Sequence, residues 1–572
     1  MARIPATTRS FLVMGTLMWA AAPAPGQFGT ELAPRELEAP GPGPLPFGRA
    51  DLPESRRTGG GVIAARLDRI RLEGGAGRPQ AMAEGVLMTA LTVDGRDVLA
   101  GRLAEFLGKP LTTDGMDRII TVILRHYETH DRPVVDVWAP RQSLADGDLT
   151  LEVIEGTVGA IGIETVGIFD DRRLGRGIRL GHGDLLRSSD LQAHLDWFNR
   201  NPFRPAALYA APGEFPGEAD LIFSFASRRP WRIYAGYENT GAEVAGGNRY
   251  FAGLNWGNAF GLDQMLSYQF TVGDALDELQ AHSLVWEIPL HPWHQFVRLR
   301  GGWAGLSTET RSRGVPVESD GTNWMLGASH GWQLPRRAGL RHEIMVGAEF
   351  KAADNFLVFG GTEQPGSVVE VLQFRADYLA ERRFERGAIE FEASLVASPG
   401  GLTGRNNDED FEAFRHGAGA AYLYGRARAV WVRQLPARWS LRLSGNLQLA
   451  DDALLPTEQL GLGGYDAVRG YQERDYLADS GYALSAELRT PAYELPLPGS
   501  SGARLQLLAF LDHGRGWRDE AVDAVDSRRT FLGTGTGARL RIGDTLSARA
   551  DLGIPLREAR GPRAHVGVTL SY

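Results

Sequence analysis

The feature that most constrains the fold is an alternation of apolar and polar residues that starts near Trp231 and continues to the C-terminal Tyr572. In one stretch, leucines occupy positions 441, 443, 447 and 449, and polar residues occupy most positions between them. Successive side chains of a β-strand point to opposite faces, so this pattern predicts strands with one apolar and one polar face. A soluble sandwich has the same alternation, and the pattern alone therefore does not establish a membrane barrel.

The lengths of the connections separate these two folds. Tight connections recur, a somewhat longer one lies near 491–502, and longer, more polar connections lie between them. The register gives about 16 strands, an even number, with short turns at one end and long loops at the other. Because a closed sheet leaves no backbone edge unpaired in lipid, we predict a single 16-stranded antiparallel transmembrane β-barrel. The tight connections lie near 257–264, 289–294, 335–339, 382–386, 436–438 and 542–544.

The N-terminus has the pattern of a secretory signal peptide, which we assign to residues 1–26. Arg3 and Arg9 precede an apolar run over 11–22, and small residues follow it. A membrane anchor is the alternative, but the run is shorter than the roughly 20 residues that a spanning helix needs. The rest of the chain contains no uncharged apolar stretch of spanning length, so any insertion of the mature chain into a membrane must use strands.

Composition excludes several functional classes. The formal charge of −9 argues against a nucleic-acid partner, because phosphate-binding surfaces need clustered Lys and Arg. The absence of cysteine excludes disulfides, thiol catalysis and cysteine-ligated zinc. The 12 histidines form no His-Glu-x-x-His pattern, and no phosphate-binding Gly-x-x-x-x-Gly-Lys-Ser/Thr loop occurs. We therefore expect no enzyme activity, no cofactor and no metal site.

Two small α+β modules are predicted between the signal peptide and the barrel. Residues 27–62 form a Pro/Gly-rich linker, with room for only a short helix around 31–38. In the first module, 63–156, helices are predicted over 98–107 and from Asp114, followed by strands at 134–138 and 149–154. The second module, 157–228, repeats the plan with a strand at 161–166, a helix from 188 or 189 to 198, and strands near 206–210 and 219–227. The barrel then occupies 229–572.

The longest informative loop, about 451–480, contains the sequence Gly463-Gly464-Tyr465-Asp466-Ala467-Val468-Arg469-Gly470-Tyr471. By the strand count this loop lies at the long-loop end. Alternation in a later strand places Asp512 on the face that looks into the lumen. Arg binds carboxylate bidentately, so Arg469 and Asp512 would pair if the loop folds inward, and its glycines permit the tight backbone required. The repeated glycines of 533–537 lie in a strand, where small residues allow close packing rather than nucleotide binding.

These motifs resemble those of two-partner-secretion outer-membrane transporters of the TpsB type, the haemolysin secretion/activation protein family of the POTRA-plus-barrel superfamily. The resemblance covers nearly the whole mature chain, in the family's order. It implies two POTRA domains before a 16-stranded barrel, with the loop Arg contacting the strand Asp. It also implies a function: export of a large partner exoprotein of haemolysin or adhesin type from the periplasm to the cell surface. The inward-loop motif is Val468, Arg469, Gly470 and Tyr471, and the lumen motif is Phe510, Asp512 and Gly514.

Further segments extend the resemblance. Pro140-Arg141-Gln142, Asp146-Gly147-Asp148-Leu149 and Glu155-Gly156 are similar to the end of a first POTRA domain, and Asn199-Arg200-Asn201-Pro202-Phe203-Arg204 to a motif of the second. Family members often carry a long N-terminal helix that plugs the pore, whereas the Pro-rich linker here gives no clear helix. The last strand resembles the terminal signal that the barrel-assembly machinery recognises, with an aromatic-ended soluble strand as the alternative. The signal residues are Gly567, Leu570 and Tyr572.

The expected partners are a secreted exoprotein, the barrel-assembly machinery during biogenesis and the lipid of the bacterial outer membrane, around a monomeric barrel. Two alternatives stay open from the sequence. An outer-membrane assembly insertase would share both barrel motifs but would usually carry more POTRA domains than the roughly 165 residues available here can supply. A passive porin would account for the barrel but not for the two periplasmic modules.

Overall fold

The computed structural model describes residues 33–37, 45–46, 61–75, 78–226, 229–241, 246–275, 278–312, 315–337, 339–359, 362–496, 502–519, 527–558 and 560–572. The predicted signal peptide and most of the predicted linker lie outside the described residues. Of the short helix expected around 31–38, residues 33–37 are described and are not helical. Among the described residues no helix is both long and apolar enough to span a bilayer.

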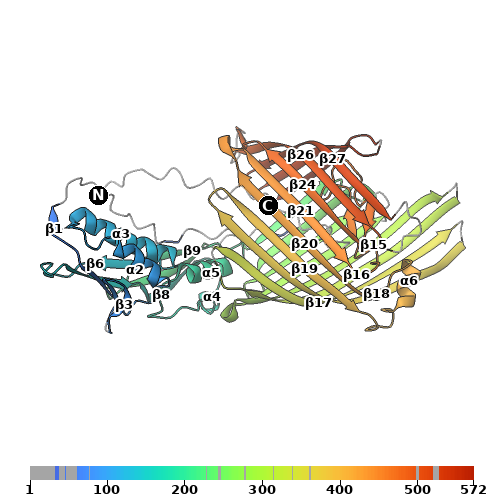
Figure 1. The fold of residues 1–572 in the computed structure, drawn as a ribbon. Helices are drawn as coiled ribbons and strands as arrows, with labels where there is room; N and C mark the ends of the chain where they lie inside the picture. Colours follow the sequence, from blue (N-terminus) through green and yellow to red (C-terminus); the bar gives the residue numbers. More distant parts are fainter. Residues whose placement is uncertain are drawn as a thin grey trace.

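The first α+β domain is a five-stranded sheet in the order β3-β4-β2-β7-β6, covered by two helices (Figure 1). Helix α3 starts where the Thr112 hydroxyl accepts the Gly115 N–H at 3.0 Å, and it buries Ile119, Ile123 and Tyr127 completely. The predicted helices and the last two strands are confirmed, whereas β3 and β4 were not predicted. The elements are β1 Val62–Ala64, β2 Arg69–Glu73, β3 Gln80–Ala83, β4 Val86–Thr89, α2 Arg96–Ala104, β5 Leu111–Thr112, α3 Thr113–Thr129, β6 Val135–Trp138 and β7 Asp148–Glu155.

The second domain is a three-stranded sheet in the order β8-β10-β9. Its helix α5 and its three strands match the predicted segments to within a few residues, and the short α4 was not predicted. Leu191, Leu195 and Phe198 of α5 are fully buried against the sheet. The elements are β8 Thr157–Val166, α4 Asp171–Gly175, α5 Ser188–Phe198, β9 Ala206–Pro212 and β10 Glu218–Ala226.

The remaining chain forms a closed antiparallel barrel. Sixteen long strands can be counted among the described residues, and the three-residue β25 adds to the connection between β24 and β26. The barrel strands and their short helices are β11 Trp231–Glu238, β12 Arg249–Ala259, β13 Gln264–Val272, β14 Leu279–Leu290, η3 His291–Trp293, β15 Gln295–Ser312, β16 Val315–Gln333, β17 Leu340–Phe359, β18 Thr362–Phe384, β19 Gly387–Pro399, α6 Asp408–Phe414, β20 Ala421–Gln434, η4 Pro436–Arg438, β21 Ser440–Ala450, β24 Ser480–Arg489, β25 Tyr493–Leu495, β26 Ala503–Trp517, β27 Arg528–Ile542, β28 Leu546–Pro555 and β29 Arg563–Ser571.

The two faces of the barrel wall differ as the alternation predicts. Leu395, Leu511 and Leu570 point outward and are about half exposed, whereas polar side chains such as Gln373 and Asp551 point inward and are buried. An apolar outer band matches lipid, and a polar interior can hold water and charged groups. The predicted register is therefore confirmed on both faces.

The barrel closes where its last strand, β29, pairs with its first strand, β11. Five residue pairs form this seam, from Tyr234–Ser571 to Glu238–Gly567. Tyr572 extends the seam, because its backbone N–H donates to the Ile233 carbonyl oxygen at 2.9 Å. The predicted assembly signal thus lies on the closing strand, with Leu570 on the outer face.

The second domain is fixed to the barrel by the segment 199–204. The Arg204 guanidinium donates to both carboxylate oxygens of Asp263, in the β12–β13 turn, at 2.6 and 2.5 Å. Asn201 donates to the same carboxylate at 2.8 Å and to the Gly257 carbonyl oxygen at 2.6 Å. All three charged or amide side chains are buried. Arg200 reaches further in and pairs with carboxylates of β14 and β17.

Aromatic rings complete this junction. The indole of Trp197, in α5, stacks on the imidazole of His294 with ring centroids 5.1 Å apart and 12° between the planes. Burial lowers the pKa of His294 to about 4 and holds the pKa of His194 below its ordinary value. Both imidazoles are therefore neutral near pH 7, which suits stacking in a dry contact. The short turns of the barrel thus form the face on which the second domain is fixed.

Removing the Arg204 guanidinium should loosen the junction. Arg204→Ala leaves Asp263 buried without its bidentate partner, which costs about 3–5 kcal/mol at a buried ion pair. We expect limited proteolysis to cut between the second domain and the barrel faster than in the unsubstituted protein. Arg187→Ala, which alters an exposed arginine of the same domain, is the control. Equal cleavage rates of the two variants would contradict this account of the junction.

Candidate functional site in the barrel lumen

The connection between β21 and β24 folds back into the lumen as a hairpin of β22 (Leu460–Leu462) and β23 (Tyr476–Ala478). Three glycines of this inward loop have positive φ: Gly463 at 94°, Gly464 at 96° and Gly470 at 98°. Side chains other than glycine rarely adopt this region, so these positions shape the tip of the loop. The tip itself is buried, as Val468, Arg469 and Tyr471 show.

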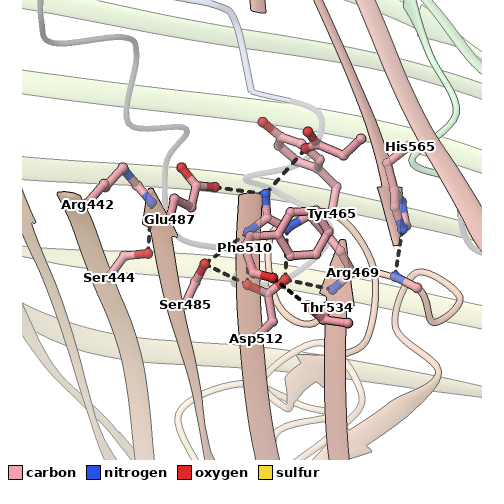
Figure 2. A network of polar contacts seen from close by, with 12 residues as sticks. Arg442, Ser444, Tyr465, Arg469, Ser485, Glu487, Phe510, Asp512, Thr534 and His565 are labelled. Carbon is pink, nitrogen blue, oxygen red and sulfur yellow. Dashed lines mark hydrogen bonds and ion pairs between the residues drawn. The ribbon is translucent and has the colours of Figure 1, made fainter. Parts of the chain in front are cut away.

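Arg469 and Asp512 form a bidentate ion pair at the barrel wall. The Arg469 Nε lies 2.8 Å from Asp512 Oδ2, and its Nη2 lies 2.9 Å from Oδ1. The Arg469 backbone N–H donates to the same carboxylate at 3.1 Å. Figure 2 shows the guanidinium lying over the Phe510 ring, with its central carbon 3.6 Å from the ring centroid. The structure thus brings together two of the predicted lumen residues and the loop arginine.

Further polar groups surround the guanidinium. Its Nη1 lies 2.8 Å from Glu487 Oε1 and 3.4 Å from Asp551 Oδ2, and its Nη2 donates to Ser485 Oγ at 3.0 Å. Ser485 in turn donates to Asp512 at 2.7 Å. One buried cation therefore binds carboxylates from three strands: β24, β26 and β28. The Arg469 guanidinium is therefore held by several charge-assisted hydrogen bonds and is excluded from water.

The sequence did not single out Glu487, Ser485 or Asp551 as partners of the loop. Glu487 and Ser485 lie on the inward face of β24 by simple alternation, so the strand pattern contained a signal for them. Choosing among inward carboxylates requires the register between neighbouring strands. In the structure Ser485 is paired with Asp512 across the β24–β26 ladder.

The other motif residues seat the loop against the wall. The Tyr471 hydroxyl donates to a carbonyl oxygen of Arg557 at 2.8 Å and lies 3.0 Å from that of Leu532, while its ring packs edge-on against Phe531. The Gly470 N–H donates to His565 Nε2 at 3.1 Å. Val468 packs over Gly514, where a Cβ would come within 2.8 Å of Val468 Cγ2. All four residues of the loop motif therefore touch β26–β29.

Glycines of the wall make this close approach feasible. A Cβ at Gly533 would lie 2.1 Å from the Arg469 carbonyl oxygen, and one at Gly553 would lie 2.3 Å from the Gly470 nitrogen. A Cβ at Gly535 would meet the Phe510 ring at 2.6 Å. The prediction that the 533–537 glycines serve close packing in a strand is confirmed: Gly533 packs against the inward loop, whereas Gly535 and Gly537 pack against the neighbouring strands of the wall.

Ion pairs also hold the base of the loop. Asp479 accepts two hydrogen bonds from the Arg415 guanidinium at 2.5 and 2.7 Å. Glu458, which is fully buried, accepts from Lys351 Nζ at 2.8 Å and from the Tyr424 hydroxyl at 2.8 Å. The loop is thus attached at its base to β17, β20 and the α6 segment, and at its tip to β24–β28.

Comparison with known proteins identifies the family. The model of the haemolysin secretion/activation protein family ShlB/FhaC/HecB matches residues 217–540, more than half of the chain. The chain belongs to this family. Its members include secretion transporters, and the barrel accordingly lies in the bacterial outer membrane with the POTRA domains in the periplasm. This membership selects a secretion transporter over the insertase and the passive porin.

Individual relatives have low sequence identity to this chain, but the similarity extends over most of each chain. The outer membrane transporter CdiB-2 of Burkholderia pseudomallei is 23% identical over 81% of this chain and 78% of its own. The heme/hemopexin transporter protein HuxB of Haemophilus influenzae is 21% identical over 73% of each chain. The solved structure of CdiB from Escherichia coli has the same fold, with a TM-score of 0.73 at 19% identity over 92% of this chain and 93% of its own.

Replacing Arg469 should release the loop from the wall. Arg469→Ala removes the cation bound to Asp512, and breaking such a buried pair costs about 3–5 kcal/mol. We expect protease added to whole cells to cut within 451–479 at least several-fold faster. Arg504→Ala is the control, because Arg504 lies on the same strand as Asp512 in an exposed pair with Glu494. If both variants resist protease like the unsubstituted protein, the ion pair does not anchor the loop.

A single methyl group at Gly533 should have a similar effect without changing charge. Gly533→Ala places a Cβ against the Arg469 carbonyl, so either the loop or the strand must move. Gly425→Ala is the matched control, since its Cβ would meet its nearest neighbour, Ser394 O, at 3.9 Å. We expect only Gly533→Ala to increase cleavage of the loop. Equal protection of both variants would show that the loop does not depend on this contact.

Proposed function

We propose that this chain exports one large, unfolded exoprotein of haemolysin or adhesin type, which adds an extended segment to an edge strand of a POTRA domain and then crosses the barrel as the inward loop moves. The observation that carries the proposal is the buried Arg469–Asp512 pair, because it attaches a separate hairpin to the inside of a pore. Folding of the exoprotein outside the cell biases its movement outward. The barrel acts as a monomer, and the terminal strand directs its assembly.

The edge of β9 is the best-supported entry point. Among the described strands β9 has one neighbour, β10, so its other edge is open to an extended guest. Backbone hydrogen bonds join residues 213 and 205 of this segment to 218 and 226. By alternation the odd-numbered residues of β9 bond to β10, and the N–H groups of Leu208 and Ala210 face outward. Tyr209 is largely exposed beside them.

The position of this edge supports delivery to the pore. Segment 199–204 fixes the second POTRA domain to the short turns of the barrel, as Figure 1 shows for α5 and the barrel end. Arg200 pairs with Glu287 and Glu343, two buried carboxylates of the inner wall. A guest bound on β9 would therefore be held at a constant distance from the entrance.

Blocking the β9 edge tests the entry step. Ala210→Pro removes an outward N–H and leaves the ladder to β10 intact, as Pro212 already does at an equivalent outward position. We expect export of the cognate exoprotein to fall at least five-fold while the amount of folded barrel stays the same. Ala210→Ser, which keeps the N–H, should export normally. Full export by Ala210→Pro would exclude this edge as the entry point.

Deletion of the gene tests the function itself. We expect one large exoprotein to disappear from the cell surface and medium, with the other outer-membrane proteins unchanged. Restoring the unsubstituted chain should restore that exoprotein. Loss of many outer-membrane proteins would instead indicate an assembly insertase.

A further inference from the structure

Residues Ala33–Leu37 lie inside the barrel, although we predicted them to be part of a linker. They line a cavity of about 760 Å³ together with inward-facing side chains of the wall. Arg35 contacts the inner faces of β11, β12 and β29, the three strands at the closure of the barrel. The segment therefore occupies a defined place on the wall of the pore.

We propose that this part of the wall, formed by β11, β12 and β29, is a binding site for an extended peptide that carries an arginine. Arg35 fills the site within the chain, and an arginine-bearing segment of the exported protein fills it during transit. The second half of this proposal rests on the export function proposed above. The site itself is argued from the contacts of Arg35.

The backbone of Arg35 is held on both sides. Its N–H donates to the Tyr234 hydroxyl at 2.9 Å, and its carbonyl oxygen accepts from Arg232 Nη1 at 3.2 Å. Backbone contacts of this kind do not depend on the side chain of the guest. They set the position and direction of an extended segment along the wall.

The side-chain contacts, in contrast, suit a guanidinium. Nη1 of Arg35 donates to Thr569 Oγ1 at 3.3 Å, and Nη2 pairs with the Glu238 carboxylate. The planar group lies over the Phe251 ring, 4.0 Å from its centroid. A fork of donors and a flat face that stacks on an aromatic ring are properties of arginine that lysine lacks.

The walls of the site are held in place by contacts of their own. The Tyr234 hydroxyl donates to Gln269 at 3.0 Å, and Glu238 also binds Arg549 at 3.1 Å. Arg232 donates to Ser571 Oγ at 2.7 Å and to Asn255 Oδ1 at 3.2 Å. The site is therefore preorganised. If Arg35 leaves, the site keeps a geometry that can bind another arginine.

Arg549 connects this site to the inward loop. Its guanidinium carbon lies 3.6 Å from the ring centroid of Tyr465, which is part of the loop, while its Nη2 binds Glu238. Movement of the loop would take the Tyr465 ring away from Arg549, which is one of the two guanidinium groups that bind Glu238. Occupation of the site and the position of the loop are thus physically linked.

The test uses the purified full-length chain in planar lipid bilayers and synthetic peptides. A chain that lacks residues 33–37 should conduct more than the complete chain, because neither the backbone nor the side chain of Arg35 then occupies the site. The peptide Ala-Pro-Arg-Glu-Leu, identical to residues 33–37, should then reduce the current. The same peptide with Gln in place of Arg should need at least ten-fold more for the same reduction.

A substitution in the chain that lacks residues 33–37 locates the peptide. Glu238→Gln should remove the preference for the arginine peptide, and Phe251→Leu should weaken it if the first variant does not fold. Glu392→Gln, at another carboxylate lining the cavity, should leave the preference unchanged. Equal reduction of current by both peptides, or no reduction by either, would overturn the site.

This measurement involves no exoprotein, so its outcome is separate from that of the export proposal. A selective peptide effect with normal export after blocking the β9 edge would keep the arginine site and exclude the entry step. No selectivity, together with loss of one exoprotein on gene deletion, would remove the arginine site and keep the transporter.

Discussion

The fold depends on one constraint: in lipid, every backbone N–H and C=O of the wall needs a partner within the sheet. The chain meets it by closing sixteen strands on themselves, counted among the described residues, through the short β11–β29 seam. In the closed barrel one face of each strand contacts lipid and carries apolar side chains, and the other face lines the lumen and carries polar ones. The polar side chains that line the lumen then need hydrogen-bond and ion-pair partners of their own.

Charged groups inside the barrel are stable only when they are paired. Around Arg469 one guanidinium binds carboxylates of β24, β26 and β28, and around Glu238 one carboxylate binds guanidinium groups from the N-terminal segment and β28. In each case a group from outside the wall satisfies a charge on it. The inward loop and the Arg35 segment are therefore both held on the wall by buried ion pairs. Either can leave only if the charged groups that it pairs with on the wall are bound by other groups.

Much of this architecture could be predicted from the sequence, because it follows from local patterns. Alternation placed Asp512 in the lumen, and the glycines at 463, 464 and 470 indicated a tight loop at Arg469. The contacts of Glu487 and Asp551 could not be predicted, since they depend on the register between strands that are distant in sequence. The helical face of α3 was clear, whereas β3 and β4 are only four residues each and give too little periodicity.

For two segments the sequence pattern did not indicate the contacts that the segment makes in the structure. The Asn199–Arg204 motif indicated a second POTRA domain, but its function in binding the β12–β13 turn appears only when Arg204 and Asp263 are placed together. The Pro-rich linker gave no clear plug helix, and residues 33–37 are indeed not helical, yet they line the pore through Arg35. Occupying a lumen therefore does not require a helix.

The most direct test of the central claim is to lock the inward loop to the wall. The chain contains no cysteine, and a Cβ at Gly514 would lie 2.8 Å from Val468 Cγ2, close enough for a disulfide between Val468→Cys and Gly514→Cys. Export of the exoprotein is measured in the oxidised and reduced states, with Val468→Cys alone as the control. Our account predicts that the oxidised double variant does not export and that reduction restores export. Normal export with the disulfide formed would show that the loop does not move, and would contradict the account.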